Sequence, residues 1–192
     1  DSVFEKFNDE TFIYENSNHQ LVVGSLNEKV WNGLGQADQF DDRYQSEIES
    51  DVLDKGIPDK APEGKISTIS VGGRVIYQRD PLIAAVRFKA SNYSCEMDPA
   101  HKTFISQKTS LPYIEAHHFI PIKFQPIFDK PLDDFDNIFS LCPNCHKKIH
   151  YAIIEEKFEM VKFLYQKRPG LNTYELDYIA QFYNCLKIVP AT

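Results

Sequence analysis

The sequence has no long hydrophobic run and no visible signal peptide. Its apolar runs are short, residues 81–86 being typical, whereas a membrane-spanning helix needs about 20 mostly apolar residues. We therefore expect no membrane segment. An initial methionine is also missing, since the chain begins at Asp1, and we expect it to be part of a longer protein with further domains upstream.

Cysteine is scarce, with 4 residues among 192. One CxxC pair beside an HxxxH pair suits metal binding better than a disulfide framework. This usage indicates a reducing compartment, and we expect a cytoplasmic protein. Cys185 stands apart from the others and is expected to be a buried core thiol.

Positive charge is not in excess. The net charge is −7, with −9 in residues 1–70 and +2 in the remainder. The strongly basic signature of a high-affinity DNA-binding protein is therefore missing. Because the acidic excess is confined to the N-terminal third, the rest of the chain is not repelled from phosphate. Hydrophobic residues, at 42%, are ample for a buried core.

Three regions follow from these patterns. Residues 1–70 are acidic and contain no motif, which favours a scaffold or a partner-binding role. Residues 71–155 contain nearly all the histidine and cysteine. Residues 156–192 are expected to form C-terminal helices packed on the core, with Pro169 and its neighbours dividing two helices.

Local signals predict two elements before the histidine-rich part. The alternation of apolar and polar residues over positions 66–71 predicts a strand. Asp80 as N-cap and Pro81 at the first helical position predict the start of a helix. The apolar residues that follow recur at helical spacing, which would leave Arg87 and Lys89 on the surface.

Histidine and cysteine are crowded into one part of the chain. Five of the six histidines and three of the four cysteines lie between Cys95 and His150, and these side chains bind transition metals well. Residues 113–122 read as a short strand that carries His117 and His118, whose side chains would point to opposite faces. One histidine could then bind metal while its neighbour serves as a general base.

Residues 142–150 read as a tight turn that enters a helix. His146 and His150, four residues apart, would lie on one helical face within reach of a single cation. Cys142 and Cys145 precede that face and could bind a different metal. The pattern therefore predicts two metal sites.

These segments resemble an HNH endonuclease of the ββα-metal type, and among these the McrA-like restriction nucleases. The resemblance spans roughly residues 75–152 and rests on the motifs RDP (79–81), CE (95–96), YIEAHHFIP (113–121) and NIFSLCPNCH (137–146). It implies an α+β fold with a ββα-metal HNH nuclease core, a structural zinc knot, flanking helices and an acidic N-terminal extension. It also implies a metal-dependent enzyme that hydrolyses DNA phosphodiester bonds, in restriction or defence against foreign or modified DNA.

The resemblance assigns the catalytic cation to three histidines. His117 and His146 would be ligands of a divalent ion (Mg²⁺, Mn²⁺ or Ni²⁺), and His150 would be a third ligand or a phosphate contact. His118 would be the general base that activates water.

Other residues would support this centre. Glu115 would orient a histidine or an arginine, and Asn137 would hold the loop between the second strand and the helix by side-chain hydrogen bonds to backbone. Lys147 and Lys148 are the best candidates for phosphate contacts, with Arg87 as a further nucleic-acid contact.

The structural zinc departs from the family pattern. McrA-like proteins usually bring two CxxC pairs to zinc, but here the first pair reads CEMD, so one cysteine is missing. Because structural zinc takes four ligands, we expect Cys95, His101, Cys142 and Cys145. Asp98 is the alternative to His101, since it keeps the spacing of the missing cysteine.

Two other functions stay open. A zinc-stabilised DNA-binding or interaction module without catalysis predicts no change in DNA turnover on His118→Ala. A toxin nuclease would use its acidic N-terminal region to dock a small partner. If the chain is a restriction nuclease, we expect it to bind DNA and to act as a homodimer or with an upstream specificity domain. A homodimer is expected because cutting both strands from a single centre usually needs two copies.

Overall fold

The computed structural model describes residues 11–15, 21–25, 44–50, 56–71 and 74–185, and most of the acidic N-terminal region lies outside them. The chain divides into two compact units, Asp1–Arg43 and Tyr44–Thr192. In the first unit, β1 (Thr11–Glu15) pairs antiparallel with β2 (Leu21–Ser25). All the elements below belong to the second unit.

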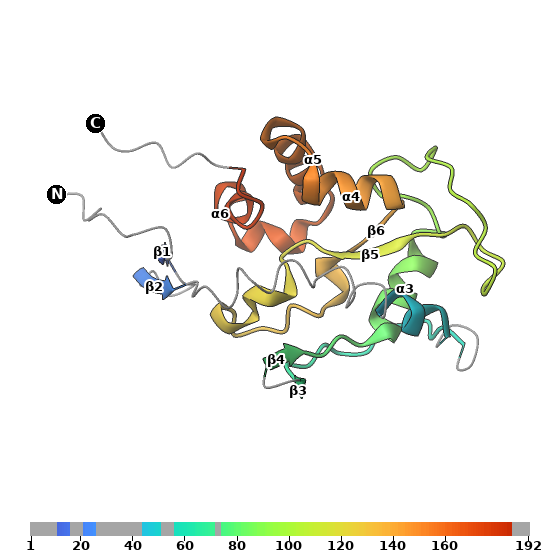
Figure 1. Ribbon diagram of the computed structural model, residues 1–192, viewed down its shortest axis with the longest axis horizontal. Helices are drawn as coiled ribbons and strands as arrows, with labels where there is room; N and C mark the ends of the chain where they lie inside the picture. The colour runs from blue at the N-terminus through green and yellow to red at the C-terminus, as the bar shows by residue number, and fades with distance from the viewer. Residues whose placement is uncertain (1–10, 16–20, 26–43, 51–55, 72–73, 186–192) are drawn as a thin grey trace. The chain divides into compact units, whose positions relative to one another are not determined.

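The centre of the second unit is a two-stranded sheet followed by a helix. β5 (Glu115–His118) pairs antiparallel with β6 (Ile138–Leu141), and α4 (Pro143–Tyr151) begins directly after β6. Figure 1 shows α4 on one side of this sheet and α3 (Pro81–Ala90) on the other. The strand expected over residues 113–122 is therefore present but shorter, and the ββα order expected from the resemblance is present.

The start of α3 follows the predicted chemistry. Asp80 lies at the N-cap, where its Oδ1 accepts a hydrogen bond of 2.9 Å from the Leu82 backbone N–H. Pro81 occupies the first helical position, where no N–H partner is needed. A side-chain cap of this kind stabilises a helix by about 1 kcal/mol. The predicted helix start is confirmed.

The predicted surface position of Arg87 on α3 is wrong. Its side chain is buried, with 7% of the residue exposed, and its Nη2 donates a 2.5 Å hydrogen bond to the Phe135 carbonyl oxygen. The guanidinium carbon also lies 3.5 Å from the Phe135 ring centroid. Burial lowers the pKa of Arg87 to about 10, so the group stays charged at neutral pH. Apolar spacing alone could not show that a long basic side chain would find this internal acceptor.

The remaining elements flank this centre. β3 (Thr68–Val71) and β4 (Arg74–Tyr77) form the hairpin that contains the predicted strand. Short 3₁₀ helices, η2 (Ile122–Ile127) and η3 (Phe135–Asn137), lie in the connection between β5 and β6. α5 (Ile154–Lys167) and α6 (Leu176–Gln181) are separated by η4 (Pro169–Thr173), which confirms the predicted division of the C-terminal helices. None of the described helices is long and apolar enough to cross a membrane.

The sheet packs on both faces because its side chains alternate. Phe139 and Leu141 of β6 lie in one hydrophobic cluster with residues of α4, α5 and α6. Ile138 lies in a second cluster, with residues of α3 and of the helical stretch 44–50. Each large apolar side chain that is buried in this way contributes about 1.5–3 kcal/mol. Cys185 belongs to the first cluster, as predicted for a buried thiol.

An ion pair between Glu96 and Arg168 connects the end of α5 to the sheet. The Glu96 carboxylate accepts a 2.7 Å hydrogen bond from the Ser140 backbone N–H and pairs with the Arg168 guanidinium. The Arg168 guanidinium carbon lies 4.4 Å from the Phe139 ring centroid. Because Glu96 follows Cys95, this contact joins the first predicted zinc ligand to β6 and to the C-terminal helices.

Candidate functional site

Two clusters of metal-binding side chains lie in the described part of the chain. Within each cluster, one ligand atom of every residue lies within 4.8 Å of the others. The first cluster is Cys95, His101, Cys142 and Cys145, and the second is His117, His146 and His150. These are the two sets that the sequence predicted for a structural zinc and a catalytic cation.

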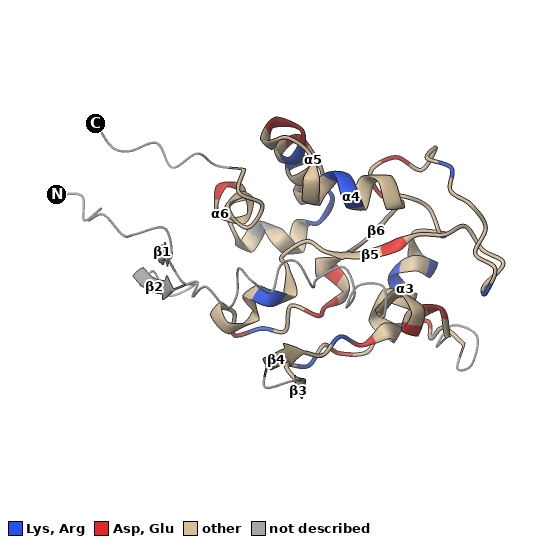
Figure 2. Cartoon of the chain, viewed as in Figure 1, with Lys and Arg blue, Asp and Glu red and all other residues tan. Residues whose placement is uncertain are grey.

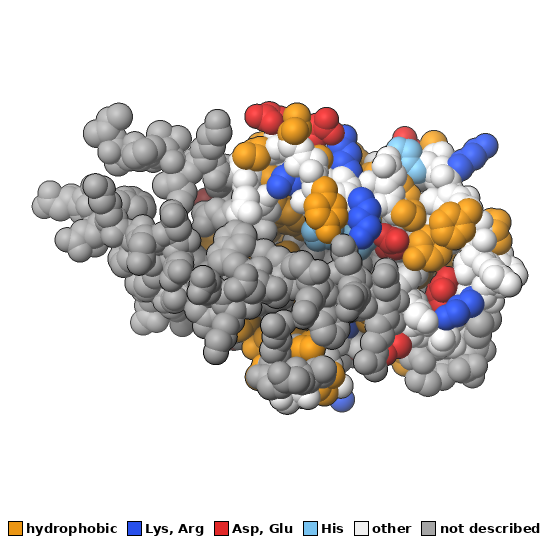
Figure 3. Space-filling view, viewed as in Figure 1, with side chains coloured by type: hydrophobic (Ala, Val, Ile, Leu, Met, Phe, Trp, Pro, Cys, Tyr) orange, Lys and Arg blue, Asp and Glu red, His pale blue; other side chains and the backbone are white. Residues whose placement is uncertain are grey.

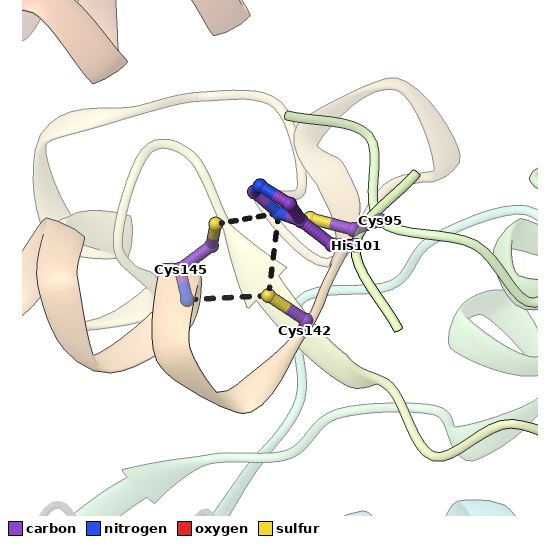
Figure 4. A group of neighbouring side chains, drawn as sticks. All are labelled: Cys95, His101, Cys142 and Cys145. Carbon is purple, nitrogen blue, oxygen red and sulfur yellow. Dashed lines mark hydrogen bonds between the residues drawn. The ribbon is translucent and has the colours of Figure 1, made fainter. Parts of the chain in front are cut away.

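The beginning of α4 builds much of the cysteine cluster. Cys142 is the N-cap of α4, and its Sγ accepts a 3.4 Å hydrogen bond from the Cys145 backbone N–H. Cys95 lies in the connection that follows α3, and His101 lies six residues further along the chain. Figure 4 shows the three sulfur atoms and the His101 ring pointing toward one another.

The spacing of these ligand atoms fits a tetrahedral zinc. His101 Nδ1 lies 3.4 Å from Cys145 Sγ and 3.7 Å from Cys142 Sγ. In a tetrahedral zinc site, bond lengths place sulfur and nitrogen ligands about 3.5 Å apart. Asp98 instead lies beside the other ring nitrogen, with Oδ2 3.8 Å from His101 Nε2. The arrangement therefore favours His101 over Asp98 as the fourth ligand.

Contacts within the cluster separate the pKa values of the thiols. A hydrogen bond from Cys145 lowers the pKa of Cys95 to about 4. The same contact raises the pKa of Cys145, and burial raises the pKa of Cys142. The hydrogen bonds among the thiols thus favour the thiolate form of Cys95 over those of its two neighbours. A cation among three such sulfurs would favour all three thiolates.

The histidine cluster joins β5 to α4. His117 comes from β5, while His146 and His150 lie one turn apart on α4. Each of the three ring centroids lies 5.0 or 5.1 Å from the other two. His117 and His146 are buried, with 2% and 7% of each residue exposed, whereas His150 is exposed. Solvent therefore reaches the cluster from the side of His150.

Hydrogen bonds assign the tautomers of the two buried ligands. Glu115 Oε2 lies 2.7 Å from His146 Nδ1, and a carboxylate accepts there, which leaves the His146 Nε2 lone pair for a metal. The Tyr183 hydroxyl donates its single proton to the Phe119 carbonyl oxygen. It must therefore accept from His117 Nε2, 2.9 Å away, which leaves the Nδ1 lone pair of His117 for a metal.

The electrostatics of His117 suit a metal ligand. Burial holds the pKa of His117 well below its usual value, and the neighbouring His150 and His146 lower it further. Burial likewise raises the pKa of Tyr183, so its phenol stays protonated. His117 is therefore a neutral imidazole, the form that binds metal ions.

His118 faces away from the three-histidine cluster. It follows His117 in β5, and its Nε2 lies 2.8 Å from Asp133 Oδ1. The prediction that the adjacent histidines occupy opposite faces is confirmed. A histidine with one nitrogen tied to a carboxylate and the other nitrogen carrying a lone pair can accept a proton.

Asn137 makes the predicted kind of contact at a different place. Its side-chain oxygen accepts from the Ile120 backbone N–H, and its Nδ2 donates to the carbonyl oxygens of Ile120 and Leu132, at 2.7–2.9 Å. These bonds close the loop between β5 and β6. The expectation that Asn137 holds the loop between the second strand and the helix is corrected, because its side chain points back to the residues that follow His118.

The lysines of α4 lie beside its histidines. Lys147 is exposed, with its Nζ 5.9 Å from the Tyr151 ring centroid. Lys148 forms a 2.6 Å ion pair with Glu156 at the start of α5. Figure 2 shows this basic stretch of α4 (blue), and in Figure 3 histidine (pale blue) reaches the surface next to lysine or arginine (blue). Since Arg87 is buried, the candidate nucleic-acid contacts are Lys147 and Lys148.

Asp133 and Tyr183 belong to the site but were not expected from the sequence. Asp133 lies in the run PLDDFDN, where neighbouring acidic residues look alike. Tyr183 lies 66 residues after its histidine partner. Neither residue lies in a motif, so the sequence carried no signal for them.

Comparisons with known proteins find a match over the segment that carries most of these residues. Residues 100–152 match the family model described as HNH endonuclease. The chain is also 32% identical, over 105 residues, to the type IV methyl-directed restriction enzyme EcoKMcrA of Escherichia coli strain K12. That match covers 54% of this chain and 35% of the relative, so the chain spans about a third of the relative's length. Residues 100–152 are therefore similar to HNH endonucleases, and the chain as a whole is similar over about half of its length to an McrA restriction enzyme.

Proposed function

We propose that this chain is a metal-dependent endonuclease that hydrolyses phosphodiester bonds in DNA, acting in restriction of foreign or modified DNA. The observation that carries the proposal is the position of His118, on the opposite strand face from three converging histidines, inside the segment that matches HNH endonucleases. The name of the restriction enzyme relative supports the biological setting.

The chain's residues would hold two metals with different roles. His117, His146 and His150 would bind a divalent cation, and their close spacing and the tautomers of the two buried ligands support this. When bound, such a cation polarises the scissile phosphate and stabilises the leaving oxygen. The Cys₃His cluster would bind a structural zinc, which contributes to folding rather than to hydrolysis.

The protein's own part in hydrolysis is to move a proton and to hold the substrate. His118 would accept the proton of the attacking water, so that the new P–O bond forms as the bond to the leaving oxygen breaks. Lys147 and Lys148 would bind backbone phosphates near His150. Asn137 would keep the residues after His118 in place through the bonds described above.

The larger assembly is also part of the proposal. Residues 71–155 would form the nuclease domain. The choice of target would rest on residues outside the nuclease domain or on a second copy of the chain. A homodimer would place two centres on the two strands of the target.

Cleavage of plasmid DNA by the wild type and by His118→Ala tests the proposal. The assay would use methylated and unmethylated plasmid with Mg²⁺, Mn²⁺ or Ni²⁺. We expect metal-dependent cleavage that falls at least ~100-fold in the variant, the usual contribution of a general base. His19→Ala, which changes the one histidine outside the segment from Cys95 to His150, serves as the matched control, and zinc content shows that each protein is folded.

Two outcomes would contradict this function. If zinc-loaded, folded wild type cleaves no DNA with any of these ions, a DNA-binding or interaction module becomes the better interpretation. If His118→Ala cleaves as fast as the wild type, His118 is not the general base.

A further inference from the structure

Asp133 occupies an unusual position beside the proposed general base. Its Oδ1 lies 2.8 Å from His118 Nε2, and only 6% of the His118 side chain and 4% of the Asp133 side chain are exposed. Its other oxygen, Oδ2, accepts a 2.5 Å hydrogen bond from the Asp80 backbone N–H at the start of α3. The carboxylate is thus buried, with both oxygens engaged.

The surrounding backbone fixes Asp133 in place. The preceding residue, Leu132, donates its N–H to Gln125 Oε1 and accepts at its carbonyl from Asn137 Nδ2, both at 2.7 Å. On another side, Gly64 approaches so closely that an added Cβ would lie 2.1 Å from the Asp133 carbonyl oxygen. The loop therefore has little room to shift, and the carboxylate is held against His118.

We propose that Asp133 is a positioning residue, which selects the His118 tautomer that can accept a proton. This inference rests on the proposed function of His118. A carboxylate only accepts hydrogen bonds, so the proton that His118 shares with Asp133 is on Nε2. Nδ1 then keeps its lone pair and is the atom that takes the proton from water. The buried carboxylate also stabilises the imidazolium that forms after this transfer.

Asp133→Asn separates this role from simple support of the loop. The Asp80 N–H needs an acceptor, so the amide oxygen of the variant would face Asp80 and its NH₂ group would face His118. His118 Nε2 would then have to accept, which moves the ring proton to Nδ1 and blocks the base. Asp133→Ala removes both hydrogen bonds and leaves His118 free to adopt either tautomer, although it leaves the partly buried Asp80 N–H without its Asp133 partner.

The two variants therefore rank differently in stability and in turnover. We expect thermal stability to fall in the order wild type, Asp133→Asn, Asp133→Ala. We expect kcat for cleavage to fall at least ~100-fold in Asp133→Asn. The fall in kcat in Asp133→Ala should be no larger than the fall in Asp133→Asn. DNA affinity, measured without added divalent ion, should stay within about twofold of the wild type, because neither change alters the lysines of α4.

Nitrogen-15 NMR of zinc-loaded protein gives a readout that does not depend on cleavage. Spectra of His118→Ala identify the His118 ring signals by their loss. We expect a proton on Nε2 of His118 in the wild type and on Nδ1 in Asp133→Asn. If the tautomer is the same in both proteins, or if turnover follows stability with Asp133→Ala the slower variant, the inference is overturned and Asp133 only supports the loop.

Failure of the proposed function would look different. If the wild type cleaves no DNA while NMR shows that the His118 tautomer differs between the wild type and Asp133→Asn, the positioning by Asp133 stands and the nuclease proposal fails. Should Asp133→Asn not fold, Asp133→Ala provides the second test, because it removes the carboxylate that fixes the proton on His118 Nε2. Full wild-type turnover and an unchanged His118 tautomer in a folded Asp133→Ala protein would overturn the inference.

Discussion

The cysteine cluster and the histidine cluster use the same helix in different ways. The cysteine cluster offers four ligands, three of them buried, and so leaves no position for a water or a substrate. The histidine cluster offers three ligands, and one of them is exposed. A closed four-ligand set is typical of structural zinc, whereas three protein ligands with an open position are typical of catalytic metals.

Their shared helix makes the dependence between them unequal. Cys142 and Cys145 define the first turn of α4, and His146 follows Cys145 directly. Loss of the cysteine cluster should therefore disturb the histidines, because α4 would lose its anchored start. Loss of the histidine cluster should leave α4 in place, since Ile149 and the first hydrophobic cluster hold the helix from its buried side.

Cys142→Ser should give the largest effect. Serine keeps an N-cap acceptor for α4 but is a poor zinc ligand, so the change isolates the loss of metal binding. Structural zinc sites contribute about 10–16 kcal/mol of binding free energy at neutral pH, and we expect the variant to lose zinc and much of its stability. Zinc content by atomic absorption and thermal unfolding by circular dichroism would measure both.

Cys185→Ser is the matched control for this change. Cys185 is also a buried cysteine, but it lies outside both metal clusters. The Cys185→Ser protein should keep its full zinc content and lose only the packing of one thiol. If Cys142→Ser retained zinc and wild-type stability, the cysteine cluster would not be the structural site.

Glu115→Gln should give a smaller effect, confined to the histidine cluster. The amide keeps the shape of Glu115 but replaces a charge-assisted hydrogen bond to His146 with a weaker one. Changes of this kind around a metal typically lower metal affinity about 10–100-fold. Isothermal titration of zinc-loaded protein with Mn²⁺ would measure that affinity, while the unfolding temperature should move little.

Glu156→Gln provides the control, because it removes a carboxylate that pairs with Lys148 at the surface. Its effect on Mn²⁺ affinity should be near zero. A fall in zinc content in Glu115→Gln as large as in Cys142→Ser would show that the two clusters are a single structural unit, against the comparison drawn above.

The sequence predicted best those features that depend on near neighbours in the chain. The start of α3 at Asp80 and Pro81, the opposite faces of His117 and His118, and the four-residue spacing of the α4 histidines follow from local backbone geometry. Both metal clusters also came together as predicted. Their ligands were found by chemical type and family spacing, which are visible before any fold is known.

The features that the sequence did not predict depend on distant partners. Arg87 is buried because it meets the Phe135 carbonyl, 48 residues away. Asp133 and Tyr183 complete the surroundings of the two adjacent histidines, from 15 and 66 residues away. Nothing in a local pattern distinguishes such a residue from an ordinary loop acid or core tyrosine, because its role exists only once the loops are packed.

Lys147→Ala should give the smallest effect and should leave both clusters intact. Lys147 is exposed on α4 next to His146, so we expect it to contact a DNA phosphate. Losing one phosphate contact should weaken binding about equally for all sequences and reduce the slope of log affinity against log salt by about 1. Fluorescence anisotropy with a His118→Ala background would measure binding without cleavage. Lys162→Ala, the same change at an exposed position of α5, should leave the slope unchanged. Equal slopes for both lysine variants would contradict the proposed phosphate contact of Lys147. The DNA backbone would then have to approach the exposed His150 side of the histidine cluster without this lysine.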